Sequence, residues 1–591
     1  MVNETKSSNR RLVTPLALGA LLLAVVVAII ALVLILGGRD QDEGAATARS
    51  AELMPQDAFM FVTFNPHLDQ AKNFEVVDSA WGDNPLIQKG LAELLGSMQE
   101  EGLDYKADIE PWLGDEIAFS IGSDFFAALG GSIDNTFAEI EGALSGETLP
   151  SPTAGAMPAV PEFTLAVATT DTAESDKFLG KLRAEADTAW TDTEYKGVNI
   201  AYSEPESDED VGAAYATIGD FVVLTAGGLE TMQEIVDAQD GANLASNQDY
   251  QDVLDKLPSD QIGYGYIDAG AYLESMLELA GPELADLPLE LFNPDQLTAI
   301  KGAGFSVGLE PNGLRVDFVG AYDKDALPED MPGAQASSGT SAGRVPASTL
   351  LYLSGSGLGN VIQMGLDAVQ AMPDQPEDLD EQLGMMTAML GVSVEEMIEM
   401  LSGEFSIAVT HNPAGIGGDP SIPVGASFLI EAKDEDKFQR LINSVSGLLS
   451  LGAEMEFPKE NLSGVEVQTI PDPSSGNMIV GWGVGEGFFA IGTSTELLEA
   501  AFGGGGEKLD ATATYKAATE PLPEETSGVF FVNMDGLLKI MVESMSDRDL
   551  ESFEEARPLL APIKAISAAA EAVDKDKDSA SGTFFILIES E

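Results

Sequence analysis

The chain of 591 residues contains an internal duplication, which limits its possible folds more than any other feature. The segment GDEIAF at 114–119 resembles SGEFSI at 402–407, and Asp176-Lys-Phe recurs as Asp436-Lys-Phe. Because these and later matches keep one order and a nearly constant offset, they predict two tandem homologous halves. The offset in residue number settles at 265 (515 − 250 = 265) in the pairs Tyr250 and Tyr515, Gly263 and Gly528, Asp268 and Asn533, and Met276 and Met541.

Within each half, short alternating apolar runs are interleaved with helical patterns. The first half has a predicted strand at 163–169 that leads into a helix at 173–186, and the second half repeats this arrangement at 425–430 and 435–449. The turn sequence Glu310-Pro-Asn-Gly313 predicts a hairpin near the end of the first half. Hairpins mixed with helices predict an α+β fold, in which each half is a largely antiparallel sheet packed with helices on one face.

An apolar segment near the N-terminus predicts a membrane anchor. No charged residue occurs from Leu12 to Gly38, and the part from Leu16 to Leu36 would span roughly 31 Å as a helix, about one bilayer core. Basic residues precede the segment and acidic residues follow it, so the N-terminus is predicted to be cytoplasmic. The alternative is a signal peptide cleaved near Ala46-Thr-Ala48, although such peptides usually have a shorter apolar region.

These patterns predict how the chain is divided. Spacers and linkers are recognised by their content of Pro, Gly, Ala and Ser. The predicted segments are a cytoplasmic tail (1–11), a transmembrane signal anchor (12–38), a juxtamembrane spacer (39–52), a first half (53–323) with a flexible insertion (141–161), a linker (324–343) and a second half (344–591).

The composition argues against several classes of function. Asp and Glu number 99 against 29 Lys and Arg, and a net charge of −70 would repel nucleic acid. The absence of cysteine excludes disulfides, Cys-ligated metals and a thiol nucleophile. The only histidines, His67 and His411, both lie beside Asn-Pro turn sequences. We therefore expect no cofactor, no metal site and no catalytic residues.

Three motifs resemble chemical signatures only in part. Gly304-Phe-Ser306-Val-Gly308 fits the nucleophile-elbow pattern, but Ser306 lies within a predicted hairpin strand. The glycines of 355–359 follow a predicted strand, as in a dinucleotide-binding loop, but Asn360 replaces the third glycine. The alternating acids of 574–578 lack the glycine and glutamate of a calcium loop. Packing and turn roles are the favoured interpretations.

Methionines are concentrated in the predicted helices at the start of the second half. Ordinary helix packing is the first interpretation of this cluster. The second is an adaptable apolar surface that binds a lipid or a partner helix. The residues concerned, which fall at helical spacings, are Met385, Met386, Met389, Met397 and Met400.

Four segments of the first half occur in a characteristic order. They are Pro-x-Asp-Ala-x-x-Phe-Val (55–62), Trp-Leu-Gly-Asp-Glu-Ile-Ala (112–118), Asp-Lys-Phe (176–178) and Gly-Asp-Phe-Val-Val-Leu (219–224). Together with the N-terminal span, this order resembles the bacterial domain-of-unknown-function (DUF) 3352 family. The resemblance implies a membrane-anchored envelope protein, and it supplies no catalytic or binding residues.

The sequence as a whole predicts a non-enzymatic protein of the cell membrane. It would cross the membrane once, with most of the chain outside the cytoplasm, and it would bind or scaffold other components of the cell envelope. The expected partners are the membrane itself and an envelope protein or lipid. The alternatives are a carrier or sensor of an apolar ligand or lipid and, less favoured, a serine hydrolase that uses Ser306.

Overall fold

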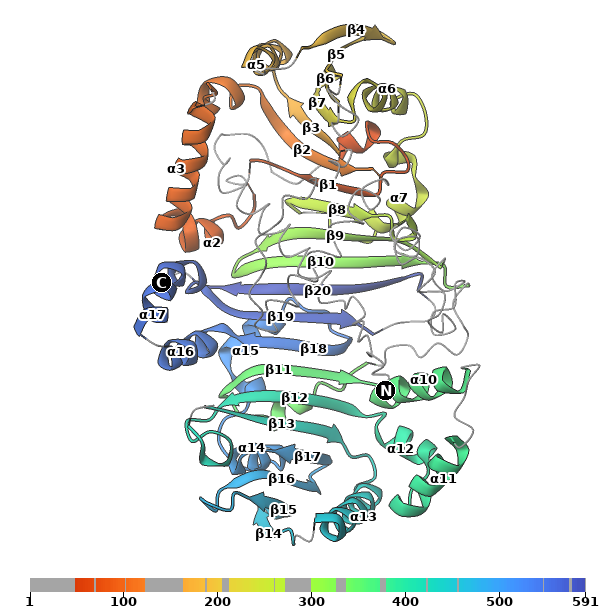
Figure 1. Cartoon of the computed structure of the whole chain (residues 1–591), viewed down its shortest axis with the longest axis vertical. Coiled ribbons are helices and arrows are strands. Elements are labelled where there is room, and N and C mark those ends of the chain that lie inside the picture. The colour runs from red at the N-terminus through yellow and green to blue at the C-terminus, as the bar shows by residue number, and fades with distance from the viewer. Residues whose placement is uncertain are drawn as a thin grey trace, which may run out of the picture.

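The computed structural model shows an elongated molecule whose strands are stacked along its long axis, with helices on either side (Figure 1). The predicted anchor (12–38) and the insertion (141–161) lie outside the described residues, and no helix within those residues is long and apolar enough to cross a membrane. The described residues are 48–67, 71–100, 102–122, 163–185, 189–204, 212–259, 261–271, 299–325, 336–371, 379–420, 423–453, 456–545, 547–572 and 577–589.

Each half contributes ten strands to the described structure. Those of the first half are β1 (Met60–Phe64), β2 (Leu113–Ile121), β3 (Phe163–Thr169), β4 (Thr191–Tyr195), β5 (Val198–Tyr202), β6 (Ala213–Ile218), β7 (Phe221–Ala226), β8 (Gly263–Ile267), β9 (Ile300–Glu310) and β10 (Gly313–Tyr322). Those of the second half are β11 (Thr349–Ser356), β12 (Glu404–His411), β13 (Val424–Glu431), β14 (Lys459–Leu462), β15 (Val465–Pro471), β16 (Met478–Gly485), β17 (Phe488–Gly492), β18 (Thr526–Asn533), β19 (Ile563–Glu571) and β20 (Ser579–Ile588).

All twenty strands belong to one antiparallel sheet, so the predicted α+β class with antiparallel strands is confirmed. The halves do not form separate sheets, however. The strand order is β4-β5-β6-β7-β3-β2-β1-β8-β9-β10-β20-β19-β18-β11-β12-β13-β17-β16-β15-β14. This order is symmetric about its centre when β1 is exchanged for β11, β2 for β12, and so on. A half-turn about the centre of Figure 1 makes the same exchange.

The two halves meet where β10 pairs with β20. Corresponding positions in these strands differ by 266 in residue number (579 − 313 = 266), because β10 begins at Gly313 and β20 at Ser579. Asp317 pairs with Thr583, and Thr583 is also the residue of the second half that is equivalent to Asp317 (583 − 317 = 266). A residue that pairs with its own equivalent marks the symmetry axis, so the pseudo-twofold axis passes between these two residues. Asp317 is buried, accepts a 2.7 Å hydrogen bond from the Thr583 hydroxyl, and pairs with the Arg315 guanidinium at 2.8 Å.

Helices cover both faces of the sheet, whereas the sequence predicted helices on one face. In β13, Leu429 belongs to the cluster that contains Leu498, while the next residue, Ile430, belongs to the cluster that contains Phe438. Adjacent residues of a strand point to opposite faces, so the two faces are packed by different helices. Strand β7 is apolar on both sides, with Phe221 and Val223 in one core cluster and Val222 in another, so both of its faces need a covering layer.

The helices of the first half are α2 (Glu75–Val77), α3 (Pro85–Glu100), α5 (Thr172–Glu185), α6 (Gly228–Ala238) and α7 (Gln248–Leu254), with short η1 (Arg49–Glu52), η3 (Asp78–Gly82), η4 (Tyr105–Ile109) and η5 (Leu244–Ser246). Those of the second half are α10 (Leu358–Ala371), α11 (Leu379–Leu390), α12 (Val394–Met400), α13 (Glu435–Ala453), α14 (Thr495–Ala501), α15 (Ala513–Thr519), α16 (Met534–Ser544) and α17 (Asp547–Leu560), with η7 (Ser341–Arg344), η8 (Ile416–Gly418) and η9 (Leu509–Ala511).

Candidate functional site

A buried glutamate occurs at the same place in each half. Glu116 of β2 accepts hydrogen bonds from the backbone N–H of Ser50 at 2.8 Å and from its hydroxyl at 2.5 Å. Glu404 of β12 accepts the same two bonds from Ser341, at 3.1 Å and 2.5 Å. These side chains hold η1 and η7 against the sheet just before the opening strands β1 and β11. A buried carboxylate that accepts several hydrogen bonds anchors backbone, so we assign both glutamates a structural role.

Tyrosines pack beside these carboxylates. In the second half, the Tyr352 hydroxyl lies 2.7 Å from the Ser341 hydroxyl and its ring packs edge-on against Tyr515. Burial raises the pKa of Tyr352 to about 12, so the phenol stays protonated at physiological pH. In the first half, Tyr250 packs edge-on against both Phe61 and Tyr266. These aromatic contacts are part of the core.

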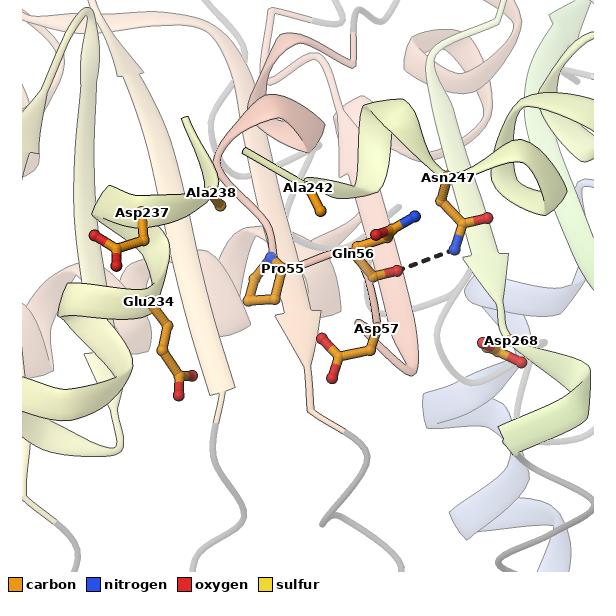
Figure 2. Close-up of a pocket in the computed structure, with 9 residues that line it drawn as sticks. All are labelled: Pro55, Gln56, Asp57, Glu234, Asp237, Ala238, Ala242, Asn247 and Asp268. Carbon is orange, nitrogen blue, oxygen red and sulfur yellow. Dashed lines mark hydrogen bonds between the residues drawn. The ribbon is translucent and has the colours of Figure 1, made fainter. Parts of the chain in front are cut away.

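An open, acidic groove with a cavity volume of about 690 Å³ lies beside the segment that leads into β1, the opening strand of the first half. Figure 2 shows the carboxylates of Glu234 and Asp57 on either side of Pro55. The Asn247 side chain donates to the Gln56 carbonyl at 3.0 Å and so fixes the segment before β1 against the start of α7. The lining residues are Pro55, Gln56, Asp57, Glu234, Asp237, Ala238, Ala242, Asn247 and Asp268.

Acids of this acidic groove have partners within the chain. Asp237 pairs with the Lys196 ammonium at 2.8 Å and accepts a 3.1 Å hydrogen bond from the Tyr195 hydroxyl. The bond from Lys196 and, more weakly, the one from Tyr195 lower the pKa of Asp237. Asp268 accepts the backbone N–H of Ala271 at 2.9 Å. These partners reduce the charge available to a ligand.

The corresponding region of the second half keeps an acid at Glu499, the counterpart of Glu234, but has lost two others. Pro55 forms an isolated β-bridge to Asn243, and Pro346 forms the equivalent bridge to Lys508. These two prolines therefore correspond, and the offset in residue number at this point is 291 (346 − 55 = 291). By this offset Ser348 replaces Asp57, and by the later offset of 265 (533 − 268 = 265) Asn533 replaces Asp268. The groove was missed by the sequence analysis, although differences between aligned acids of the two halves could have indicated it.

The structure divides the predicted methionine patch. Met385 and Met389 lie on α11 with 55% and 57% of their surface exposed. Met397 of α12 is half-buried, and Met400 is buried in the cluster formed with Ile430. Met386 belongs to α11, and its side chain lies outside the described structure. Only Met385 and Met389 therefore remain as a candidate binding surface.

Ser306 lies in the middle of β9 and is fully buried. It is opposite Asp317 of β10 and Tyr264 of β8, and β9 continues past it as a regular strand to Glu310. The predicted strand is confirmed. A nucleophile elbow needs a sharp strand-to-helix turn that exposes the serine, and this geometry does not occur at Ser306.

The glycines of 355–359 have packing and turn roles. Gly357 has a φ of +79° where β11 turns into α10, a backbone conformation that favours glycine. A Cβ on Gly359 would lie 2.2 Å from the carbonyl oxygen of Ile398, so this glycine allows α12 to approach the start of α10. The interpretation as a tight turn accounts for both residues.

The remaining predicted motifs do not form a site within the described residues. Asp578 is exposed and lies 3.5 Å from the Lys256 ammonium, while 573–576 fall outside the described structure. His67 follows β1 of the first half, and His411 ends β12 of the second. The part of the chain that the structure describes contains no group of three or more His, Asp or Glu arranged to hold a metal ion.

Comparison with known proteins gives one extensive match. A family profile described as "Protein of unknown function (DUF3352)" matches residues 16–587. No curated protein matches the sequence. Among solved structures, "Structure of crystal form III of TP0453" is 11% identical with a TM-score of 0.22 and covers 47% of this chain and 80% of its own. "Structure of crystal form I of TP0453" is 8% identical with a TM-score of 0.23, covering 47% and 79%. These scores are too low to establish a shared fold.

Proposed function

The chain belongs to the DUF3352 family of proteins of unknown function, and from this premise we propose that it is a non-enzymatic scaffold or binding protein of the cell envelope. It would be anchored by the segment 12–38 and extend outside the cytoplasm. The observation that supports a scaffolding role is the single antiparallel sheet that continues through both halves. Nine consecutive residue pairs join β10 to β20, so these two described strands tie the halves together through continuous backbone pairing.

The sheet ends in strands that discourage further pairing. The edge strand β4 has Asp192 and Glu194 exposed, and the edge strand β14 has Lys459 and Glu460 exposed. Charged side chains on short edge strands oppose edge-to-edge association of sheets. Such a molecule is suited to present its faces and helices to partners while its edges stay unpaired.

Cysteine labelling tests the proposed location. The chain has no cysteine, so a single introduced thiol reports one position. Gly506 is exposed, and a Cβ there meets nothing within 4 Å, which makes Gly506→Cys a mild change. In spheroplasts, a membrane-impermeant maleimide should label Gly506→Cys, and it should label Ser7→Cys only after the membrane is opened. The reverse pattern, or loss of the chain from the membrane fraction with 12–38 intact, would contradict the proposal.

A carrier of an apolar ligand is the second candidate, supported by the exposed Met385 and Met389. Native mass spectrometry of the full chain purified gently from its host distinguishes the two candidates. A bound lipid or other apolar small molecule, lost on replacing both methionines with serine, would favour the carrier. The bare chain mass would favour the scaffold.

A further inference from the structure

Helix α11 has one packed face and one exposed apolar face. Leu383, Thr387 and Leu390 are half-buried, and the helix lies against α13. The other face presents Met385 and Met389, each more than half exposed. Gly384 and Ala388, on the same face, are also exposed. No charged residue occurs from 382 to 394, so this face lacks the polar side chains that normally cover a surface helix.

The helix in the same position of the first half has an ordinary surface. Both α3 and α11 lie in the connection between the first and second strands of their half, on opposite sides of Figure 1. The exposed face of α3 has Lys89 and Glu93, which are about 70% exposed and lie 3.8 Å apart. The apolar face of α11 is therefore not required by the shared fold.

The pattern of residues on α11 fits an approaching helix. Gly384 and Ala388 are one turn apart and small, so another helix backbone could come close over them, alongside the row of the longer Met385 and Met389 side chains. Methionine is flexible and polarizable and adapts to varied apolar partners.

The acidic residues that follow α11 in the chain favour a basic partner. Glu395 and Glu396 are exposed at the start of α12, which follows α11 after a short turn, while the Glu399 carboxylate pairs with the Lys437 ammonium at 3.4 Å. A second copy of the chain, at a net charge of −70, would be repelled, and so would an anionic lipid surface. A helix with lysine or arginine beside its apolar stripe would be attracted.

We propose that the exposed face of α11, formed by Gly384, Met385, Ala388 and Met389, is a docking surface for an amphipathic, basic helix of a partner protein. This inference rests on the proposed function and specifies the kind of partner that the scaffold holds. It uses the second half alone, since α3 of the first half has a charged surface.

The test measures fluorescence anisotropy of a labelled peptide made only of leucine and lysine, with leucine on one helical face. The full chain is held in phosphatidylcholine nanodiscs, and binding to empty nanodiscs is subtracted. We expect the double variant Met385→Ser/Met389→Ser to weaken binding by about tenfold or more, because each lost methionine removes apolar contact area. Leu86→Ser is the matched control on exposed α3 and should leave binding unchanged.

A peptide of the same composition with scrambled order should bind at least about tenfold more weakly, since its leucines do not share a face. Equal binding of the two peptides, equal binding by the double variant, or no binding at all would overturn the proposal. The proposal would also be overturned if the chain formed a dimer, or bound phosphatidylglycerol vesicles, and the double variant abolished that association. The occupant of the face would then be a second copy of the chain or a lipid. Maleimide labelling of Gly506→Cys tests the envelope location separately, so failure of either proposal can be recognised.

Discussion

The two halves of the molecule have the same strand order but different surfaces. Both anchor their opening segment with a buried glutamate, Glu116 or Glu404, that accepts two bonds from a serine. On the surface, α3 has an ion pair where α11 has exposed methionines. The acidic groove, likewise, has Asp57 where the second half has serine. The duplicated core has therefore kept the contacts that define the sheet, while surfaces free of packing constraints have diverged.

The largest effect is expected from removing the duplicated carboxylates. Glu116→Ala or Glu404→Ala leaves buried N–H and O–H donors without an acceptor, and each should lower the free energy of unfolding by about 3–5 kcal/mol. Urea denaturation of the full chain in nonionic detergent measures the loss. The comparison predicts similar losses in the two halves. A large loss from only one variant would show that the shared geometry is not energetically equivalent.

A carboxylate at the pseudo-twofold axis should destabilise the junction. Thr583→Asp would place a second acid beside the buried Asp317, and like charges there should cost about 2 kcal/mol, since Arg315 offsets part of the repulsion. Trp112 and Trp190 report the first half and Trp482 the second, whereas Trp81 donates a 3.0 Å hydrogen bond to the Leu559 carbonyl of the second half. When the variant is unfolded with urea, the fluorescence change of Trp482 should occur at a different urea concentration from that of the first-half tryptophans. Thr583→Ser, which keeps the hydroxyl, should retain a single transition.

The helix α3 should depend slightly on its charged surface. Lys89→Ala removes the ion pair with Glu93 at i, i+4, and the free energy of unfolding should fall by about 0.3–0.5 kcal/mol. Chemical denaturation at low and high salt measures this, and the difference should shrink at high salt. On α11, Met389→Ser should change stability as little, because the side chain is exposed. A marked loss at Met389 would mean that it packs in the core.

The smallest effect concerns acid stability of a turn in the second half. The Ser474 hydroxyl, followed by backbone N–H groups of Ser475 and Ser474, lowers the pKa of Asp472 to about 2. A lowered pKa stabilises the folded state above the unfolded pKa of about 3.9, and this contribution is lost as the pH falls through 2. The stability difference between wild type and Asp472→Asn should therefore shrink between about pH 4 and pH 2. A difference that is constant over this range would contradict the assignment.

The local elements could be predicted from the sequence because their signals are local. The alternating run at 163–169 forms β3, and the turn Glu310-Pro-Asn-Gly313 joins β9 to β10 as expected. The match of 114–119 with 402–407 aligned Glu116 with Glu404, whose hydrogen bonds are the same in both halves. The candidate site was predicted less well, since helical spacing gave all five methionines equal weight. Burial of Met400 and exposure of Met385 depend on the neighbouring elements.

The α+β class, the antiparallel hairpins and the family follow from the amino-acid sequence, because alternation, turn residues and ordered motifs are properties of short segments. Three features become visible only in the folded molecule: the strands form one sheet, Asp317 faces Thr583, and helices cover both faces. Local patterns do not predict these features, because β10 and β20 are separated by almost the whole second half of the chain and any exposed strand edge offers the same backbone hydrogen bonds. Which edges meet is settled by the packing of the whole chain.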